Sequence, residues 1–287
     1  MNDPDASLHR CGLVAIIGRP NVGKSTLINR LVGTKISITS NRPQTTRHRI
    51  TGVVSSPDAQ IILVDTPGFQ MAHDRALNKI MNHTVTNSLG GADVVLFMVE
   101  ALNFGREDSR VVALLPKMIP VVLVINKTDK VREKSRLLPF MEKVSQTFPF
   151  ADVVPVSAAK GTQSRQLIEV LKGHLPIAPA MFDEDTLTDR SERFLAAEFL
   201  REKLFRLLGE ELPYAATVMV ETFELRANVR HIQASIVVDK ENHKAMVIGA
   251  KGQKLKAIAS QARVDMEKLF GGKVFLEVRV RVKRGWS

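Results

Sequence analysis

The sequence contains few of the features that define several other protein classes. One of its 287 residues is cysteine, Cys11, which excludes an internal disulfide and indicates a reducing compartment. The longest apolar runs, Val94–Val99 and Val121–Ile125, fall far short of the ~18 residues of a membrane-spanning helix. Residues 1–10 carry two aspartates and no apolar core, unlike a secretory signal peptide. These shortages predict a cytoplasmic protein.

Acidic residues are also in short supply, and this deficit extends over both halves of the chain. The formal net charge is +11, and Lys and Arg outnumber Asp and Glu by 22 to 14 in residues 1–182 and by 19 to 12 in residues 190–287. Four acids and no base occupy residues 183–189 between them. A basic surplus of this size attracts polyanions, either nucleic acid or an anionic membrane surface.

Residues 12–176 alternate short apolar runs with longer segments of helical spacing. The apolar runs are too short and too rich in β-branched residues to be helices, so we expect buried strands. The predicted strands are 13–17, 61–64, 94–99, 121–125 and 153–156, and the predicted helices are 24–32, 107–116, 133–148 and 163–174. This alternation predicts an α/β fold with a doubly wound, mostly parallel sheet. Ligands of such sheets bind at the carboxyl ends of the strands.

A different pattern follows this first domain, which itself comes after an N-terminal tail of residues 1–11. Residues 177–190 contain Pro179 and the acidic stretch, and they predict a surface linker. Residues 191–287 form a second domain of the α+β class. Its predicted elements are a helix over 191–208 capped by Asp189 or Ser191, strands over 214–224 and 230–239, helices over 242–248 and 253–270, and a strand over 273–282. The order is αββααβ.

A phosphate-binding loop is the first motif with a chemical meaning. The phosphate loop, Gly18-Arg-Pro-Asn-Val-Gly-Lys-Ser25, fits the P-loop pattern G-x-x-x-x-G-K-[ST] and lies between a predicted strand and a predicted helix. Glycines let successive backbone N–H groups converge on phosphate oxygens, Lys24 supplies charge, and the Ser25 hydroxyl is a Mg²⁺ ligand. The residues expected to line the nucleotide here are Gly18, Asn21, Val22, Gly23, Lys24, Ser25 and Thr26.

A second phosphate motif follows the predicted strand 61–64. In Asp65-Thr66-Pro67-Gly68 the aspartate is placed to hold Mg²⁺ through water, and the N–H of Gly68 is placed to sense a γ-phosphate. Taken alone, the segment would be better explained as a Pro-Gly turn.

A guanine-recognition motif, Asn126-Lys127-Thr128-Asp129, follows the predicted strand 121–125. The Asp129 carboxylate can accept both the ring N1–H and the exocyclic amino group of guanine, whereas adenine lacks this donor pair. Asn126 can tie this loop to the phosphate loop, and the stem of Lys127 can cover the base. Ser157 and Ala158, which follow the strand 153–156, are placed to offer a backbone N–H to the guanine oxygen.

These motifs have the order and spacing of the translation-factor class of GTPases, which residues 12–174 resemble. The class pattern P-x-x-T-R matches Pro43–Arg47, and it favours Thr46 over Thr45 as the switch threonine that closes on Mg²⁺ and the γ-phosphate. The resemblance implies a GTP-hydrolysing enzyme. Its expected catalytic residues are Lys24, Thr46, Gly68 and Asn21, and its expected Mg²⁺ ligands are Ser25, Thr46 and, through water, Asp65.

One catalytic residue of this class is missing. Phe69 stands where many GTPases of this kind place a glutamine that orients the attacking water. An aromatic ring cannot orient a water molecule, so we expect slow hydrolysis without an activator. Proteins that resemble this group and share the hydrophobic replacement often use K⁺ near the phosphates. Asn21 is then either a K⁺ ligand or only a stabiliser of the loop, and the sequence favours neither.

The second domain carries a glycine loop between two predicted helices. The pattern of this GxxG loop, Gly249-Ala-Lys-Gly252, is common, but inside an αββααβ unit it resembles the loop of a type II (prokaryotic) KH domain. In that fold the loop lets a nucleic-acid backbone approach, while an adjacent apolar groove takes unstacked bases. Core packing is the commoner fate of apolar residues beside such a loop. The expected RNA contacts are Ile248, Gly249, Ala250, Lys251, Gly252, Lys254 and Leu255.

The chain as a whole resembles the Era family of bacterial GTPases, in which a TrmE-Era-EngA-like GTPase domain precedes a type II KH domain. The segments that carry the resemblance are Pro43–Arg47, Thr188–Lys203, Gly209–Tyr214 and Lys273–Lys283. The resemblance implies a GTP switch that binds the 3′ end of small-subunit ribosomal RNA and assists assembly of the small ribosomal subunit. It also implies loose association with the inner face of the cell membrane. We expect a monomer.

Two other functions stay open at the level of the sequence. A membrane-associated GTPase of cell-cycle control would use the basic surface for anionic lipid, although no amphipathic anchor or lipidation motif supports it. An RNA-binding protein that uses GTP mainly as a structural ligand would be consistent with Phe69.

Overall fold

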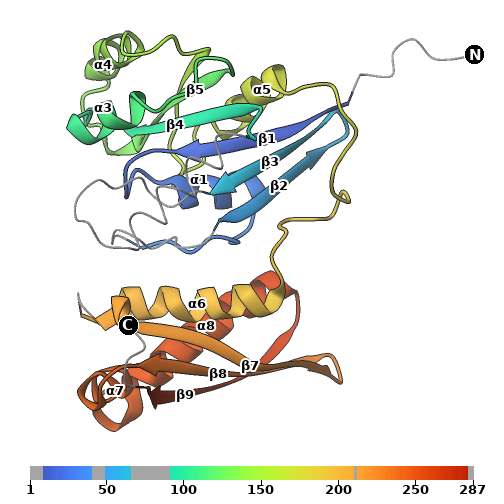
Figure 1. Cartoon of the computed structure of the whole chain (residues 1–287), viewed down its shortest axis with the longest axis vertical. Helices are drawn as coiled ribbons and strands as arrows, with labels where there is room; N and C mark the ends of the chain where they lie inside the picture. Colours follow the sequence, from blue (N-terminus) through green and yellow to red (C-terminus); the bar gives the residue numbers. More distant parts are fainter. Residues whose placement is uncertain (1–8, 41–48, 66–90, 210–211, 284–287) are drawn as a thin grey trace, which may run out of the picture. The chain divides into compact units, whose positions relative to one another are not determined.

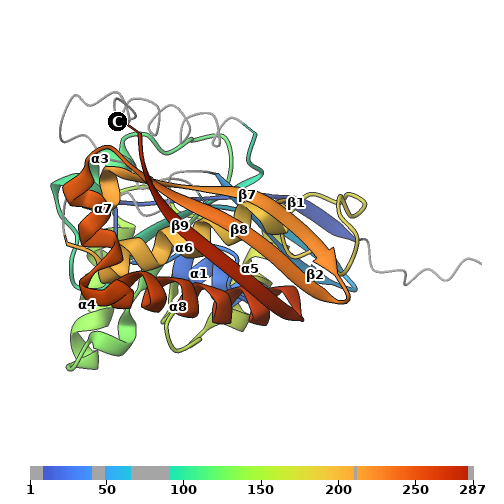
Figure 2. The ribbon, with the colours of Figure 1, turned by 90° about the horizontal axis from the view of Figure 1, so that it is seen from below.

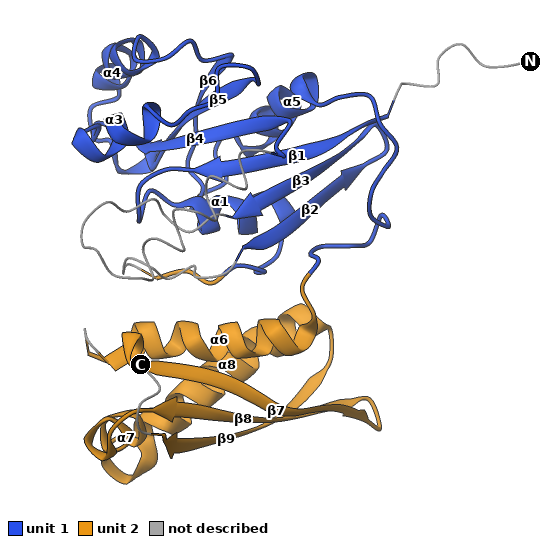
Figure 3. Cartoon of the chain, viewed as in Figure 1, with its two compact units in different colours: residues 1–37, 46–189 blue, residues 38–45, 190–287 orange. Residues whose placement is uncertain are grey.

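The computed structural model, drawn in Figure 1, describes residues 9–40, 49–65, 91–209 and 212–283. The chain divides into two compact units, which Figure 3 distinguishes by colour. Unit 1 comprises residues 1–37 and 46–189, and unit 2 comprises residues 38–45 and 190–287. Each unit has its own sheet and its own hydrophobic core. Within the described ranges, no helix combines the length and the apolar character that a bilayer crossing requires.

Unit 1 is built on a six-stranded sheet with the strand order β2-β3-β1-β4-β5-β6. The strands are β1 (Arg10–Ile17), β2 (Ile50–Ser56), β3 (Ala59–Asp65), β4 (Val94–Glu100), β5 (Val121–Asn126) and β6 (Asp152–Pro155). All neighbours pair in parallel except β2, which runs antiparallel to β3. The mostly parallel sheet is therefore confirmed. The edge strand β2 is additional, and its sequence, which contains Gly52 and ends in two serines, lacks a continuous apolar run.

Helices cover both faces of this sheet. They are α1 (Lys24–Val32), α3 (Arg106–Val112), α4 (Leu137–Ser145) and α5 (Ser164–His174), with the short 3-10 helices η1 (Thr128–Lys130) and η2 (Lys134–Arg136). The strand β3, which follows α1, lies on one side of β1 in the sheet. The strands β5 and β6, which follow α3 and α4, lie on the other side of β1. Right-handed crossovers therefore place α1 opposite α3 and α4. The helix predicted over 133–148 is shorter than expected, because η2 replaces its first turn.

Unit 2 has the predicted order αββααβ. Its elements are α6 (Glu192–Leu207), η3 (Leu212–Tyr214), β7 (Ala216–Arg226), β8 (Val229–Val238), α7 (Glu241–Ile248), η4 (Ala250–Gly252), α8 (Gln253–Phe270) and β9 (Lys273–Val282). The central strand β8 runs antiparallel to β7 and parallel to β9. α6 and α8 pack together on the sheet, as Figures 1 and 2 show from two directions. The core between them contains Phe199, Ile232 and Ile258.

The predicted linker lies along unit 1. The N–H of Val53 in β2 donates to the carbonyl oxygen of Leu187 at 2.9 Å. Asp189 accepts the Thr51 hydroxyl at 3.1 Å. Ser191 is the N-cap of α6, because its side chain accepts the N–H of Phe194 at 3.3 Å.

Candidate functional site

The phosphate loop joins β1 to α1 at the carboxyl edge of the unit 1 sheet. Gly18 and Gly23 have φ angles of 154° and 106°, which side chains rarely allow. A Cβ on Gly18 would lie 2.5 Å from the carbonyl oxygen of Met98, and a Cβ on Gly23 would lie 2.3 Å from Nδ2 of Asn126. Asn21 adopts a left-handed φ of 63° between them. The loop backbone is therefore packed against β4 and against the guanine motif.

Lys24 lies inside the curve of this loop. Its Nζ donates to the carbonyl oxygens of Gly18 and Arg19, at 3.0 and 3.1 Å. The residue is 7% exposed. Burial lowers the pKa of Lys24 to about 8, against a smaller opposing effect of the Asp65 carboxylate. The protonated form of Lys24 is costly in this buried position. An anion that enters the loop offsets that cost, because it pairs with the ammonium.

Three oxygen-bearing side chains meet next to the phosphate loop, where Mg²⁺ is expected. The Ser25 hydroxyl donates to Oδ2 of Asp65 at 2.7 Å, and Ser37 donates to the same oxygen at 2.7 Å. Asp65 is fully buried. The described residues contain no group of three or more His, Cys, Asp and Glu side chains suited to a metal. One hydroxyl and one carboxylate fit a Mg²⁺ ion that completes its shell with water and phosphate oxygens.

Asn126 connects the guanine motif to two neighbouring segments. Its Nδ2 donates to the carbonyl oxygen of Val22 at 2.8 Å, which is the tie to the phosphate loop that the sequence suggests. Its Oδ1 accepts the N–H of Ala158 at 3.0 Å. The Thr128 hydroxyl donates to the carbonyl oxygen of Val156 at 2.9 Å. The motif is thus fixed between the phosphate loop and the segment that follows β6.

Asp129 is positioned by Ser157. The Ser157 hydroxyl donates to Oδ1 of Asp129 at 2.6 Å, and this bond holds the pKa of Asp129 below its ordinary value. Asp129 therefore stays ionised, as an acceptor of guanine N–H groups must.

The backbone donors after β6 differ from the expectation. The N–H of Ser157 donates to the carbonyl oxygen of Thr162 at 3.2 Å, and the N–H of Ala158 donates to Oδ1 of Asn126 at 3.0 Å. Both groups already have partners within the chain. A hydrogen bond from Ala158 to the guanine oxygen would have to share its donor with Asn126.

Some expected contacts lie outside the described residues. They are Thr46, Thr66, Pro67 and Gly68, and the same holds for Thr45 and Phe69. Their roles stay predictions, as does K⁺ binding by Asn21, whose side chain is exposed. The described part does bring the phosphate loop, Asp65 and the guanine motif to one edge of the sheet, at the carboxyl ends of β1, β3 and β5.

Three charged residues at this edge are absent from the predicted set: Arg19, Glu100 and Asp108. Arg19 pairs with Glu100 at 3.2 Å and lies 3.3 Å from Asp108. Arg19 occupies a variable position of the P-loop pattern, so the motif assigns it no role. The sequence does indicate Glu100 by one feature, its charge at the carboxyl end of an otherwise apolar strand.

The GxxG loop of unit 2 joins α7 to α8 through backbone that favours glycine. Gly249, Lys251 and Gly252 have φ angles of 71°, 49° and 73°. A Cβ on Gly252 would meet no atom within 4 Å, so the space beside the loop is open. Ala250, Lys251 and Lys254 are exposed, whereas Ile248 and Leu255 are half-buried. Leu255 packs against the unit 2 core, which limits what it can offer to a base.

The chain matches known proteins over nearly its whole length. Residues 13–127 match a family described as 50S ribosome-binding GTPase, and residues 211–287 match the KH domain family. GTPase Era of Nitrosomonas eutropha is 55% identical over 98% of this chain and 95% of its own length. GTPase Era of Chromobacterium violaceum is 54% identical over 99% of this chain and 95% of its own. The chain belongs to the Era family of GTPases.

Solved structures of Era have the same fold as this family member. Era in complex with MgGDPNP and nucleotides 1506–1542 of 16S ribosomal RNA matches with a TM-score of 0.91 and 39% identity, covering 97% of this chain and 95% of that one. A variant of Aquifex aeolicus Era bound to GDP and AlF4⁻ also matches with a TM-score of 0.91 and 39% identity. The family and the fold predicted from the motifs are therefore confirmed.

Proposed function

We propose that this Era family member is a GTP-binding and GTP-hydrolysing switch that binds the 3′ end of small-subunit ribosomal RNA and assists small-subunit assembly. The observation that carries the proposal is the likeness, at a TM-score of 0.91 and 39% identity, to an Era that holds both MgGDPNP and a 16S ribosomal RNA segment. That likeness covers 97% of this chain, so it includes the part that binds nucleotide and the part that binds RNA.

The arrangement of unit 1 supports the nucleotide part of the proposal. Lys24 neutralises the outer phosphates from within the phosphate loop, whose backbone N–H groups surround them. Asp129, kept ionised by Ser157, accepts the N1–H and amino group of guanine. Ser25 and, through water, Asp65 would hold Mg²⁺, which when bound would supply positive charge beside the phosphate oxygens.

Hydrolysis on this scheme is slow unless an activator completes the site. Thr46 and Gly68 are the expected contacts to the γ-phosphate, whereas Phe69 stands in place of the glutamine that would orient the attacking water. We infer that Asn21 would help to hold K⁺ near the phosphates, where the ion would supply part of the missing charge stabilisation.

The arrangement of unit 2 supports the RNA part. The GxxG loop leaves open space at the N-terminus of α8, where backbone N–H groups and the helix dipole favour a phosphate. Lys251 and Lys254 are exposed beside it and neutralise further phosphates. Half-buried Ile248 provides an apolar surface for an unstacked base.

We expect a monomer in the cytoplasm with loose membrane association. No described feature favours a role in cell-cycle control at the membrane over RNA binding.

Single-turnover hydrolysis of GTP tests the enzymatic part and separates it from a purely structural use of GTP. We expect slow turnover in Na⁺ buffer and faster turnover when K⁺ and the RNA 3′ end are added. Asn21→Ala should reduce the K⁺ effect. Lack of acceleration by both K⁺ and RNA would favour a protein that uses GTP mainly as a structural ligand.

A further inference from the structure

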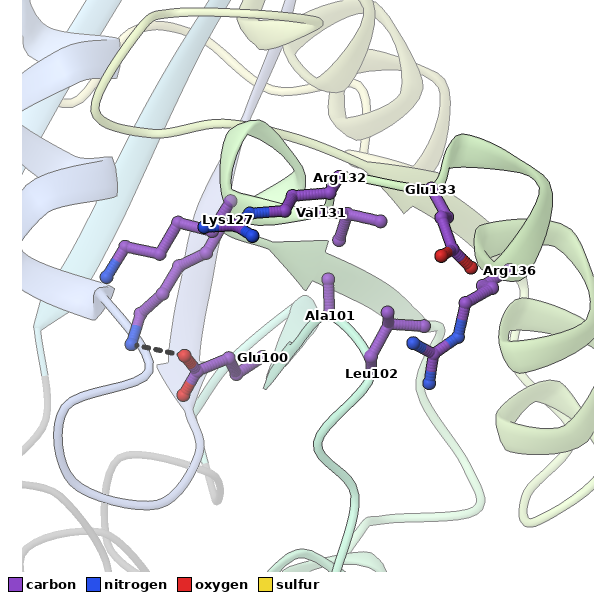
Figure 4. A pocket seen from close by; sticks show the side chains of 9 residues that line it. Glu100, Ala101, Leu102, Lys127, Val131, Arg132, Glu133 and Arg136 are labelled. Atoms are coloured by element: carbon purple, nitrogen blue, oxygen red, sulfur yellow. Dashed lines mark ion pairs between the residues drawn. The ribbon is translucent and has the colours of Figure 1, made fainter.

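Glu100, at the end of β4, bridges the two motifs that surround the proposed nucleotide site. Its carboxylate lies 3.2 Å from Nη2 of Arg19 in the phosphate loop and 3.0 Å from Nζ of Lys127 in the guanine motif. Figure 4 shows the ion pair with Lys127. The two cations approach different oxygens, Oε2 and Oε1, so the carboxylate can hold both at once.

The surroundings of Glu100 make this bridge stiff. The three side chains are between 16% and 23% exposed, so the pairs are partly shielded from water. On its other side Arg19 lies 3.3 Å from Asp108, which is 1% exposed and accepts the N–H of Gly105 at 2.9 Å. Burial acts to raise the pKa of Glu100, but Lys127 and Arg19 outweigh burial and hold the pKa below its ordinary value.

The space next to Lys127 explains why its side chain needs a fixed partner. A cavity of about 360 Å³ opens beside it, bordered also by Leu102 and by the segment from Lys130 to Glu133 (Figure 4). A lysine stem has many rotamers of similar energy, and Lys127 already lines this cavity. Without Glu100, Lys127 can turn into the cavity and leave the position from which its stem covers the base.

We propose that Glu100 is a positioning residue for guanine-nucleotide binding, which sets Lys127 over the base and fixes the phosphate loop through Arg19. Glu100 acts through these two residues and does not itself touch the nucleotide. The inference rests on the proposed function and adds a residue that neither the P-loop pattern nor the guanine pattern contains.

Removing the charge of Glu100 has two opposing effects on affinity. It raises the positive potential near the phosphates, which favours binding, and it frees two long side chains, which disfavours binding. The freed cations become hydrated and their field is screened, whereas the lost alignment of the two loops is not compensated. Weaker binding is therefore expected.

The test is the dissociation rate of fluorescent GDP and GDPNP from the full chain carrying Glu100→Gln, which is nearly isosteric. We expect release of both nucleotides to accelerate about tenfold, the scale usual for coupled charged contacts. The matched control is Asp58→Asn, which removes the 2.9 Å ion pair between Asp58 and Lys172. Asp58 directly precedes β3 and so lies at the opposite edge of the same sheet. The control should release nucleotide at the wild-type rate.

A double-mutant cycle with Lys127→Met separates positioning from a general loss of stability. If Glu100 acts largely through Lys127, Glu100→Gln should have at most half of its effect in the Lys127→Met background, while the thermal midpoints without nucleotide stay alike. Fully additive effects, a wild-type release rate, or tighter binding by Glu100→Gln would each overturn the inference. If the wild-type chain holds no guanine nucleotide, the proposed function fails instead.

Discussion

At the scale of single residues, the nucleotide site depends on side chains that hydrogen bonds within the chain hold in place. Lys24 is buried, and its hydrogen bonds go to backbone carbonyls of its own loop. Asn126 uses its amide on Val22 and its oxygen on Ala158. These roles could be predicted, because each motif sits in a fixed strand–loop–helix context. The roles of Glu100 and Asp108 could not be predicted, because their contacts with Arg19 depend on which strands lie side by side in the sheet.

The lowered pKa of Lys24 makes nucleotide affinity depend on pH. Without nucleotide the ammonium loses its proton near pH 8, since burial lowers its pKa to about 8. Bound phosphate favours the charged form and raises this pKa, so binding above pH 8 takes up a proton. Affinity for GDP should therefore be flat below pH 8 and fall by up to about tenfold per pH unit above it.

Titration calorimetry from pH 7 to 9 in two buffers of different ionisation enthalpy measures this proton uptake. The control is Lys24→Arg, whose guanidinium keeps its charge throughout and should show no uptake. Affinity that does not change over this range would mean that Lys24 stays protonated without nucleotide.

At the scale of elements, unit 2 follows the sequence closely because its core obeys simple periodicity. Residues of alternating character form β7, β8 and β9, and the glycines at 249 and 252 mark the turn between α7 and α8. The structure differs from the sequence-based prediction where contacts with neighbouring elements determine the conformation of a segment. β2 is a strand because it pairs with β3 as a hairpin. The predicted linker lies along unit 1 because Val53 and Thr51 bind its backbone and side chains.

Gly252→Asp tests the GxxG loop as the RNA contact. The new side chain meets open space but places a negative charge at the N-terminus of α8, where an RNA phosphate is expected. RNA affinity should fall at least about tenfold, while GDP affinity stays at the wild-type value. Some loss of stability is expected, because the φ of 73° at Gly252 disfavours side chains.

Gly252→Ala is the control for this strain, since it adds a side chain without charge. Filter binding of an RNA oligomer and thermal unfolding should be measured for both variants. If Gly252→Asp and Gly252→Ala bind RNA equally well, the phosphate does not lie at this helix terminus.

At the scale of the whole molecule, the question is how nucleotide in unit 1 affects RNA in unit 2. Residues 38–40, which precede the proposed switch threonine Thr46 by a few positions, group with unit 2. The N–H of Thr39 donates to Oε1 of Glu202 in α6 at 2.9 Å, and Arg206 donates to the Thr39 hydroxyl at 2.8 Å. No sequence pattern predicts this grouping, because it depends on tertiary contacts of a polar segment. These hydrogen bonds hold Thr39 within unit 2, a few residues before Thr46.

If GTP binding controls RNA binding, the RNA affinity of the chain must differ between the two nucleotide states. The most direct measurement is the Kd of the full chain for an RNA oligomer with the 3′-end sequence of small-subunit ribosomal RNA, with Mg²⁺ and either GDPNP or GDP. Both titrations must use one salt concentration. We expect binding at least about tenfold tighter with GDPNP. Equal Kd values in the two nucleotide states would mean that the nucleotide does not control RNA binding.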